Sequence, residues 1–222
     1  MADNYLGRKM EEYEAQKCAS VRTRRVSLIS LLAKNRRVSL ISLLAKNRST
    51  RGFDTTFKVR KDQLVALVEA ARLAPSARNQ QVLRFRLVTA EEAHLVLPHI
   101  GLGGALPELH LPLPNTEPNA FVVICATKEG RYVDMDLGIA AQTMLLRAVE
   151  MGLNGVCIAA FDRETISANL KLPYPPQLIL AIGRSAERIE IVDIAEGEEQ
   201  KYYRKNGVHF VPKLQTEDLI IG

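Results

Sequence analysis

Residues 136–160, DLGIAAQTMLLRAVEMGLNGVCIAA, contain the two elements that decide the fold. Residues 136–151 are apolar on nearly every side of a helix, which is typical of a helix buried inside a protein or at an interface. Gly152 suits the C-terminal cap of that helix. Residues 155–160 then form a short apolar run, which predicts a strand covered on both faces. A buried helix followed by a buried strand indicates a layered domain of mixed α and β structure.

The flanking segments predict the other elements of this domain. They are a helix over 62–73 that ends before Pro75, strands over 83–89, 121–126 and 177–183, and a short helix capped by Asp162. Asn206-Gly207, between two strand-like segments, predicts a β-hairpin near the C-terminus. Residues 98–119 hold five prolines and three glycines, which predicts a long loop or lid. The order of the elements predicts a three-layer α+β fold.

Composition narrows the class of protein. The chain has 222 residues, which allows one domain or two small ones, and it is 47% hydrophobic and 25% charged, as in ordinary globular proteins. No apolar run is long enough to span a bilayer, and the charged start, MADNYLGRKMEEYEAQK, is unlike a secretory signal. Three cysteines without a CxxC pair are unlike a disulfide framework or a zinc ribbon. We therefore expect a cytoplasmic protein with neither a metal site nor a membrane span.

The basic charge of the chain is concentrated in one segment. Residues 15–53 contain ten Lys and Arg residues and no Asp or Glu, whereas the net charge of the whole chain is +5. The remaining residues hold 20 basic against 25 acidic side chains. Such a block could bind nucleic acid or an anionic lipid surface. A solvated helix is favoured, because no aromatic residue is interleaved among these cations for base stacking.

The same segment contains an identical tandem repeat. RRVSLISLLAKN occupies residues 24–35 and again residues 36–47. A shift of twelve residues turns a continuous helix by about 120°, so the leucines of the two copies cannot face the same groove. We expect the second copy, which is joined directly to Arg48, to pack against the folded domain that follows it. We expect the first copy to be an insertion. The chain is therefore divided into a basic helical segment, 1–47, and a folded domain, 48–222.

No side-chain catalyst stands out in the sequence. The four histidines, His94, His99, His110 and His209, lack the spacing of a helical metal pair and are interpreted as surface or loop residues. Cys157 lies between Val and Ile, which raises the pKa of a thiol, and is interpreted as a core residue. The sequence also lacks a nucleophile elbow. If the protein is an enzyme, a cofactor is expected to supply the chemistry.

Two polar clusters could hold such a cofactor. Residues 48–51, Arg-Ser-Thr-Arg, place two guanidinium groups and two hydroxyls close together, which suits a phosphate. Ser76 and the amides of 79–81 offer partners to a polyol or a heteroaromatic edge. Each residue alone could be a cap or turn residue. Two such clusters separated by one helix indicate a nucleotide site.

Four stretches in order resemble the nitroreductase family, the FMN-dependent NAD(P)H oxidoreductases, from about Asn47 to the end of the chain. They are NRSTRGF at 47–53, APSARNQQ at 74–81, GLNGVCIAAFD at 152–162 and VPK at 211–213. In the family these positions hold an arginine-rich opening element, an APSxxNxQPW segment, a glycine-bearing strand and loop, and a closing basic motif. The chain departs from that pattern at Asn47, at Val82-Leu83 in place of Pro-Trp, and at Leu214 in place of a second basic residue.

The resemblance implies a three-layer nitroreductase-like fold, with a central, mostly antiparallel sheet flanked by helices. It implies a homodimer with FMN at the subunit interface and an exchanged C-terminal arm. The implied cofactor-binding residues are Arg48, Ser49, Arg51, Pro75, Ser76, Asn79, Gln81, Cys157, Ile158, Ala159, Ala160 and Lys213. The cations and Ser49 would bind the phosphate and ring edge, and 75–81 the ribityl chain and ring. Residues 157–160 would pass along the isoalloxazine, with a backbone N–H near Ala159 facing flavin N5.

The activity implied by the resemblance is ping-pong hydride transfer. NAD(P)H, as co-substrate, would reduce the flavin at N5, and a nitroaromatic, a quinone or a similar small acceptor would then be reduced. No side-chain acid or base is assigned, and neither nucleic acid nor membrane is expected as a partner. The alternatives are a flavin carrier or sensor with little turnover, and a nucleic-acid or membrane-surface binder that uses the basic segment. A dehalogenase or a double-bond reductase is the nearest alternative among redox enzymes.

Overall fold

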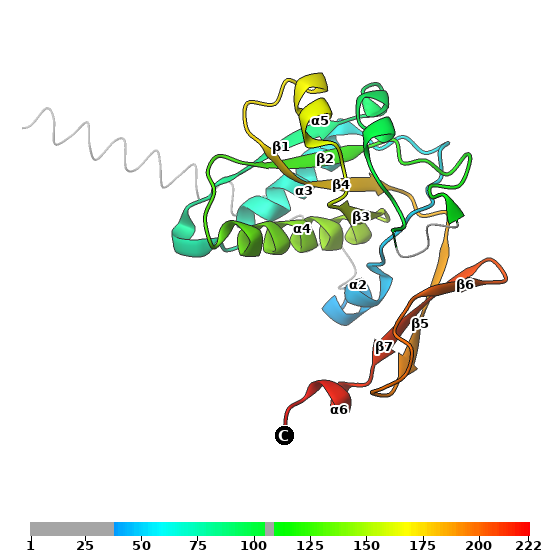
Figure 1. Cartoon of the computed structure of the whole chain (residues 1–222). Coiled ribbons are helices and arrows are strands. Elements are labelled where there is room, and N and C mark those ends of the chain that lie inside the picture. The colour runs from blue at the N-terminus through cyan, green and yellow to red at the C-terminus, as the bar shows by residue number, and fades with distance from the viewer. Residues whose placement is uncertain (1–37, 105–108) are drawn as a thin grey trace, which may run out of the picture. The chain divides into compact units, whose positions relative to one another are not determined.

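An antiparallel sheet of four strands forms the centre of the fold (Figure 1). The computed structural model describes residues 38–104 and 109–222, and residues from Leu40 to Gly222 form one compact unit. The strands, in their spatial order, are β1 (Leu83–Val88), β2 (Phe121–Ala126), β4 (Pro176–Gly183) and β3 (Asn154–Ile158). Each pair of neighbours is antiparallel, which confirms the predicted character of the sheet.

Strand β2 is buried on both faces, as its continuous apolar sequence predicts. Side chains alternate along a strand, so Val122 and Ile124 belong to one core cluster, and Phe121 and Val123 to another. The protein therefore has a hydrophobic core on each side of the sheet.

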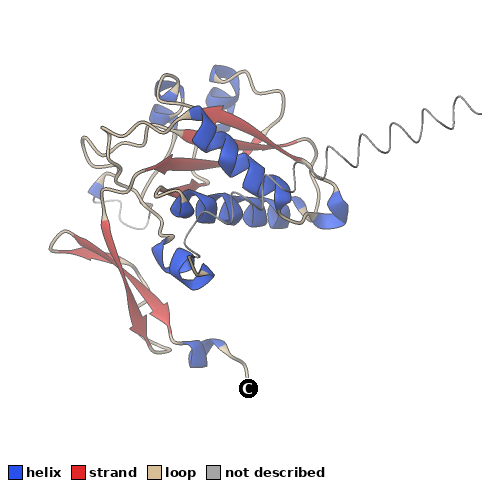
Figure 2. Cartoon of the chain, turned by 180° about the vertical axis from the view of Figure 1, so that it is seen from behind, coloured by secondary structure: helices blue, strands red, loops and turns tan. Residues whose placement is uncertain are grey.

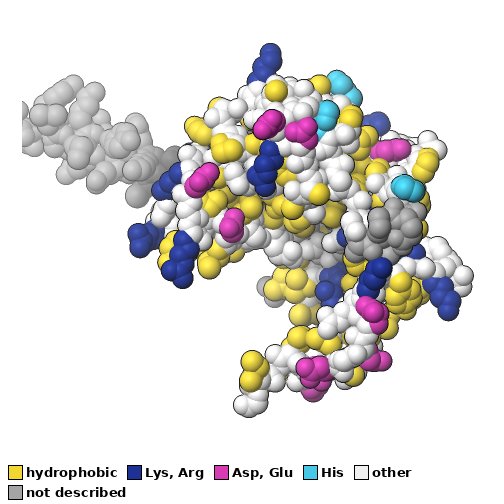
Figure 3. Space-filling model, viewed as in Figure 1, with side chains coloured by type: hydrophobic (Ala, Val, Ile, Leu, Met, Phe, Trp, Pro, Cys, Tyr) yellow, Lys and Arg dark blue, Asp and Glu magenta, His cyan; other side chains and the backbone are white. Residues whose placement is uncertain are grey.

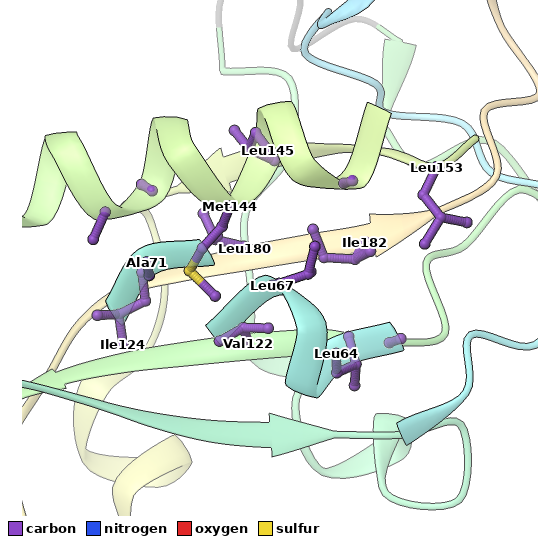
Figure 4. Packing of buried hydrophobic residues seen from close by; sticks show 14 of the residues in the cluster. Leu64, Leu67, Ala71, Val122, Ile124, Met144, Leu145, Leu153, Leu180 and Ile182 are labelled. Atoms are coloured by element: carbon purple, nitrogen blue, oxygen red, sulfur yellow. The ribbon is translucent and has the colours of Figure 1, made fainter. Parts of the chain in front are cut away.

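Two long helices cover the first face of the sheet (Figures 1 and 4). They are α3 (Lys61–Leu73) and α4 (Val133–Glu150). Leu67 of α3 and Met144 of α4 are fully buried and pack with Val122 and Leu180 of the sheet (Figure 4). Full burial of one such side chain stabilises the fold by about 1.5–3 kcal/mol. The predicted helices are thus confirmed, with α4 beginning three residues earlier than expected.

A thinner layer covers the second face (Figure 2). It consists of α5 (Arg163–Asn169) and two short 3-10 turns at Ala93–Leu95 and Leu97–His99, and Ile166 of α5 is fully buried there. The carboxylate of Asp162 accepts a hydrogen bond from the backbone N–H of Thr165 at 3.0 Å, so the predicted N-cap is confirmed. Helices, sheet and helices make the three predicted layers of the α+β fold.

A tight cap joins α4 to β3. Gly152 has a φ of +76°, and the N–H of Leu153 donates to the carbonyl oxygen of Ala148 at 2.9 Å. This pattern is the Schellman cap, which a left-handed glycine permits. Strand β3 then ends at Ile158, two residues earlier than the apolar run predicts.

We call the three layers described so far the body. A second, three-stranded sheet follows the body and is called the arm. It contains β5 (Arg188–Ile194), β7 (Val208–Leu214) and β6 (Tyr203–Lys205), in that spatial order, and α6 (Thr216–Leu219) follows it. Asn206 and Gly207 both have positive φ between β6 and β7, which confirms the predicted hairpin. Strand β5 was not predicted from the sequence. It pairs in parallel with β7, and the partner of a parallel strand cannot be inferred from a nearby turn.

The second repeat copy contributes a helix to the body. Helix α2 (Leu40–Lys46) belongs to the compact unit, and the carbonyl oxygen of Lys46 accepts a hydrogen bond from the Asn154 side chain at 2.8 Å. Leu40 and Ile41 stay exposed, and no residue of α2 is fully buried. The first copy, residues 24–35, lies outside the described residues.

The predicted loop over 98–119 is irregular over its described parts, 98–104 and 109–119. The N–H of Gly101 donates to Ala160 O at 2.7 Å, and the N–H of Phe53 donates to Thr116 O at 2.9 Å. These bonds attach the loop to the segment after β3 and to the chain before α3.

No helix among the described residues has both the length and the apolar character that crossing a bilayer requires. In the same part of the chain, no three His, Cys, Asp or Glu side chains gather in an arrangement that could hold a metal ion.

Candidate functional site

A cavity of about 390 Å³ opens where the body meets the arm, and we call it the cationic cavity. Four parts of the chain form its wall: residues 44–51, helix α4, strand β3 and the arm. The lining residues are Leu44, Asn47, Arg48, Ser49, Arg51, Gln142, Leu145, Gly155, Val156, Cys157, Tyr202, His209, Val211 and Lys213.

Residues 48–51 reach the cavity because they run alongside the edge of β3. Ser49 forms a parallel bridge with Gly155, and the N–H of Thr50 donates to the Gly155 carbonyl oxygen at 3.1 Å. A Cβ at Gly155 would clash with the backbone of Ala181 and lie 2.8 Å from a methyl carbon of Leu145. The absence of a side chain at Gly155 therefore lets β3 lie close to β4 and α4 at the point where Ser49 pairs with it.

Contacts with the arm hold Arg51 in place. Its guanidinium lies 4.8 Å from the centre of the Tyr202 ring and donates to Ser49 O at 3.2 Å. Its backbone N–H donates to the carboxylate of Glu187 at 2.6 Å. Glu187 also forms an ion pair with Arg204 of β6, so one carboxylate connects the arginine segment to the arm.

The cavity has a strongly positive lining. Arg48, Arg51 and Lys213 face it, and none of the described residues that line it carries a carboxylate. The Nε of Arg48 is buried without a hydrogen-bond partner, although another nitrogen of the same guanidinium donates to Leu44 O at 2.8 Å. Burial lowers the pKa of Arg48, since desolvation penalises its charged form. Such an arrangement can bind a phosphate, whose oxygens would satisfy the unpaired donor and compensate the charge.

Cys157 is not the core residue that its neighbours in the sequence indicated. Its side chain is exposed and lines the cavity, because an edge strand presents alternate side chains to opposite faces. The surrounding protein atoms still desolvate the sulfur and raise the pKa of the thiol, as expected from its apolar neighbours.

His209 is not the surface or loop residue that sequence analysis indicated. It lies in β7 with 2% of its surface exposed, and neither ring nitrogen has a hydrogen-bond partner within the described structure. Its ring centre lies 5.2 Å from that of Tyr202. A histidine alternating with apolar residues before VPK was the available signal of an inward-facing side chain.

The second polar cluster lines a different cavity, of about 230 Å³, which we call the 75–81 cavity. Pro75, Ser76 and Gln81 line it together with Asp136 and Ala140 of α4. Asn79 ends the 3-10 turn Ala77–Asn79, and its side-chain oxygen accepts a hydrogen bond from the Gln81 amide at 3.1 Å. The loop has an unusual backbone, since Arg78, Asn79 and Gln81 have φ values of +52°, +52° and +49°. Strain of this kind is concentrated at binding sites.

Asp136 holds this loop and was not predicted as a site residue. Its carboxylate, 5% exposed, accepts a hydrogen bond from the backbone N–H of Ala77 at 2.8 Å. The signal in the sequence was a carboxylate near the start of an otherwise apolar helix. A buried carboxylate needs a donor, and the strained turn supplies one.

The remaining predicted residues lie at and beyond the end of β3. Ile158 is buried in the core of the second face. Ala159 and Ala160 are exposed, and the Ala160 carbonyl oxygen is occupied by the N–H of Gly101.

Within one chain the structure therefore divides the predicted residues into two groups. Arg48, Ser49, Arg51, Cys157 and Lys213 share the cationic cavity. The 75–81 loop lies near Asp136 of α4, with its own cavity. Sequence analysis missed Gln142, Tyr202 and His209, which also line the cationic cavity.

Known proteins with similar sequences point to one family. The model of the nitroreductase family matches residues 44–104 and 105–184. A protein of Methanocaldococcus jannaschii that is named as a nitroreductase is 39% identical over 57 residues, which are 26% of this chain and 29% of that protein. A protein of Streptococcus pyogenes named as an NAD(P)H nitroreductase is 23% identical over 163 residues, covering 58% of this chain and 82% of the other.

Solved structures agree with the sequence matches. An FMN-dependent nitroreductase of Clostridium difficile is 28% identical, with a TM-score of 0.55, over 67% of this chain and 89% of that one. A structure from Exiguobacterium sibiricum, described as a nitroreductase in complex with FMN, is 16% identical, with a TM-score of 0.56 over 69% and 91% of the two chains. This last likeness concerns the fold. With the family model matching more than half of its residues, the chain belongs to the nitroreductase family.

Proposed function

We propose that this protein is an FMN-dependent oxidoreductase that moves a hydride from NAD(P)H, through flavin N5, to a nitroaromatic, a quinone or a similar acceptor. The observation that carries the proposal is the cationic cavity, in which Arg48, Arg51 and Lys213 surround a volume with no carboxylate among its described lining residues. The relatives support it, because one solved neighbour is named FMN-dependent and another relative is named for NAD(P)H.

The residues of this chain supply binding and orientation. Arg48, Arg51 and Lys213 hold the phosphate, and the Ser49 hydroxyl adds a neutral donor. The protein exerts its effect through charge and position, so no side-chain acid or base is assigned. When bound, FMN supplies two-electron chemistry at N5, which divides the reaction into two half-reactions, one for NAD(P)H and one for the acceptor. The cytoplasmic location expected from the sequence is part of the same proposal.

We also propose a homodimer in which each flavin lies between two copies and the C-terminal arms are exchanged, each arm crossing to the partner beyond Lys213, which stays at the cavity of its own chain. The two groups of predicted residues support this arrangement, because one chain keeps them in two separate cavities. A second copy can bring its 75–81 loop to the cationic cavity of the first. Exposed apolar side chains on α2, on the arm and at the C-terminus, among them Ile41, Tyr203 and Ile221, are available for such an interface (Figure 3).

An absorbance spectrum of the purified protein tests cofactor and reaction together. We expect a flavin band near about 450 nm that bleaches on addition of NADPH or NADH and returns on addition of a nitroaromatic or a quinone. Steady oxidation of NAD(P)H with such an acceptor would exclude a carrier or sensor. Protein that stays colourless and does not bind added FMN would overturn the proposal.

Mixing two variants tests whether the site is shared between copies. Lys213→Glu reverses a charge in the cationic cavity, and Asn79→Gly removes an amide from the 75–81 loop while allowing its positive φ. Each homodimer should bind FMN weakly at both of its sites. A mixed dimer should regain one intact site, since one copy keeps its cation and the other its amide. Equal weakness in the mixture would show that both residues act within one chain.

A further inference from the structure

His209 is a buried, unpaired histidine whose ring lines the cationic cavity. Both ring nitrogens lack a hydrogen-bond partner among the described residues. Buried polar groups are nearly always paired, and an exception calls for an explanation such as a missing ligand. The same cavity holds a second unsatisfied group, the Nε of Arg48. Two unsatisfied groups in the wall of one positively charged cavity indicate an anion that would engage both.

The charges around His209 are mostly positive. Arg204 is the residue of β6 that pairs with His209 in the sheet. Arg51, in the segment between α2 and α3, is close enough for its charge to repel a proton on His209. Lys213 lies farther along β7, and Arg48 lines the same cavity. On the side of β5, Arg188 lines an adjoining cavity that His209 also borders.

Two other titratable groups face His209. Glu187, which precedes β5, is the neighbouring carboxylate, and it already binds Arg204 and the N–H of Arg51. The ring of Tyr202 lies against that of His209, tilted by 57°. Burial, Arg204 and Arg51 together lower the pKa of His209 below its ordinary value, and Glu187 opposes them. The imidazole is therefore neutral near pH 7 when the cavity contains no anion.

We propose that His209 is a phosphate-binding residue of the cationic cavity, which takes up one proton from solvent when the phosphate dianion of FMN enters. A phosphate ester brings a charge of about −1.5 to −2 at pH 7. That charge outweighs the repulsion by Arg51 and Arg204 and makes a cation at His209 favourable. The inference rests on the proposed function, because it takes FMN as the ligand.

The sign of the pH effect follows from this linkage. Binding raises the pKa of His209 from its lowered value in the free protein, so the bound state holds more protons between the two values. The affinity must then rise as the pH falls through that window, by up to about tenfold per pH unit for one linked proton. The phosphate loses charge near pH 6, which weakens binding there, so the contribution of His209 has to be isolated with a variant.

Titration of the apoprotein with FMN, followed by flavin fluorescence, tests the inference. Wild type, His209→Gln and the control His94→Gln are compared from pH 5.5 to 8.5, and riboflavin serves as the ligand without a phosphate. His94 is an exposed residue in a 3-10 turn outside the cavity. The ratio of wild-type to His209→Gln affinity for FMN should rise at least about fivefold from pH 8 to pH 6. It should stay constant for riboflavin, and His94→Gln should behave as wild type.

Two further measurements detect the same proton by other means, and the second of them needs no variant. Calorimetry in buffers of different ionisation enthalpy should show wild type taking up about one more proton than His209→Gln per FMN bound near pH 7. If that variant does not fold, an NMR titration of the wild-type histidine resonances tests the inference. FMN should move the titration midpoint of the His209 resonance to a higher pH.

The outcomes separate this inference from the proposed function. Absence of FMN binding by wild type at pH 8 would contradict the proposed function itself. Normal binding at pH 8 with the same pH dependence in wild type and His209→Gln would overturn the role of His209 alone. An equal effect with riboflavin would also overturn it, since riboflavin has no phosphate to compensate the cation.

Discussion

Gly155 lies where the arginine segment runs beside β3, and its missing side chain leaves room for the backbone of Ala181 and for Leu145. We expect Gly155→Ala to lower the free energy of unfolding by about 1–3 kcal/mol, because the new methyl group would clash with Ala181 and Leu145. Urea unfolding would measure the loss. Binding of FMN should weaken as well, since Arg48 and Ser49 would lose their position.

A glycine without close neighbours provides the matched control. Gly138 lies in α4, and a Cβ there would meet nothing within 4 Å. Gly138→Ala should leave stability unchanged or raise it by up to about 1 kcal/mol, because alanine favours the helix. Equal stability of the two alanine variants would contradict the steric argument.

His209 should make the apoprotein sensitive to acid. Its pKa is lowered in the folded state, so between that value and the ordinary value near about 6.5 the unfolded chain binds more protons. Its contribution to stability is therefore present above about pH 6.5 and is lost as the pH falls toward the folded pKa. The urea midpoint of wild type should drop more between pH 7.5 and 5.5 than that of His209→Gln. Parallel curves for the two proteins would contradict the assignment.

Asp136 should act on the 75–81 loop through one hydrogen bond. Asp136→Ala leaves the part-buried N–H of Ala77 without its charged acceptor, which should cost about 1–3 kcal/mol. Asp136→Asn keeps an acceptor oxygen and should cost less. Hydrogen exchange at Ala77 would report the difference directly, and equal protection in both variants would show that the carboxylate does not hold the turn.

At the scale of the elements, the tandem repeat allows the contribution of α2 to be tested by deleting one copy. Removing residues 24–35 or 36–47 produces the same polypeptide, because the two copies are identical. The shortened chain keeps a helix joined directly to Arg48, so its unfolding midpoint and its affinity for FMN should match those of the full chain. A large loss in either would show that the extra copy is needed for the fold.

At the level of elements, the success of sequence analysis depended on how local the signal was. Strand β2, the Asp162 cap, the Gly152 cap and the Asn206-Gly207 hairpin were predicted, since alternation, capping residues and turns are read from a few neighbours. Strand β5 was missed because it is partly exposed along its length and because its parallel partner, β7, follows only after β6 in the sequence.

For the whole molecule, the proposed exchange of arms predicts a role for the C-terminal tail. Leu219, Ile220 and Ile221 are exposed in a single chain, with Ile221 fully so. Removing residues 216–222 should weaken the dimer at least about tenfold while leaving the core of each copy folded, because the tail buries no side chain within its own chain. Sedimentation at several concentrations would measure dimerisation, and circular dichroism would check the fold. An unchanged dimer would exclude the tail from the interface.

The amino-acid sequence by itself determined the layers and most element boundaries, because burial and capping leave periodic marks along a chain. The four motifs that resemble nitroreductases indicated the family. Tertiary structure decided which polar residues meet. Arg48 and Lys213 lie near opposite ends of the folded domain, and they share a cavity because Ser49 pairs with Gly155 and β7 returns beside the body. The burial of His209 and the separation of the 75–81 loop were decided in the same way. Both depend on contacts between strands and helices distant in sequence, and such contacts leave no local pattern.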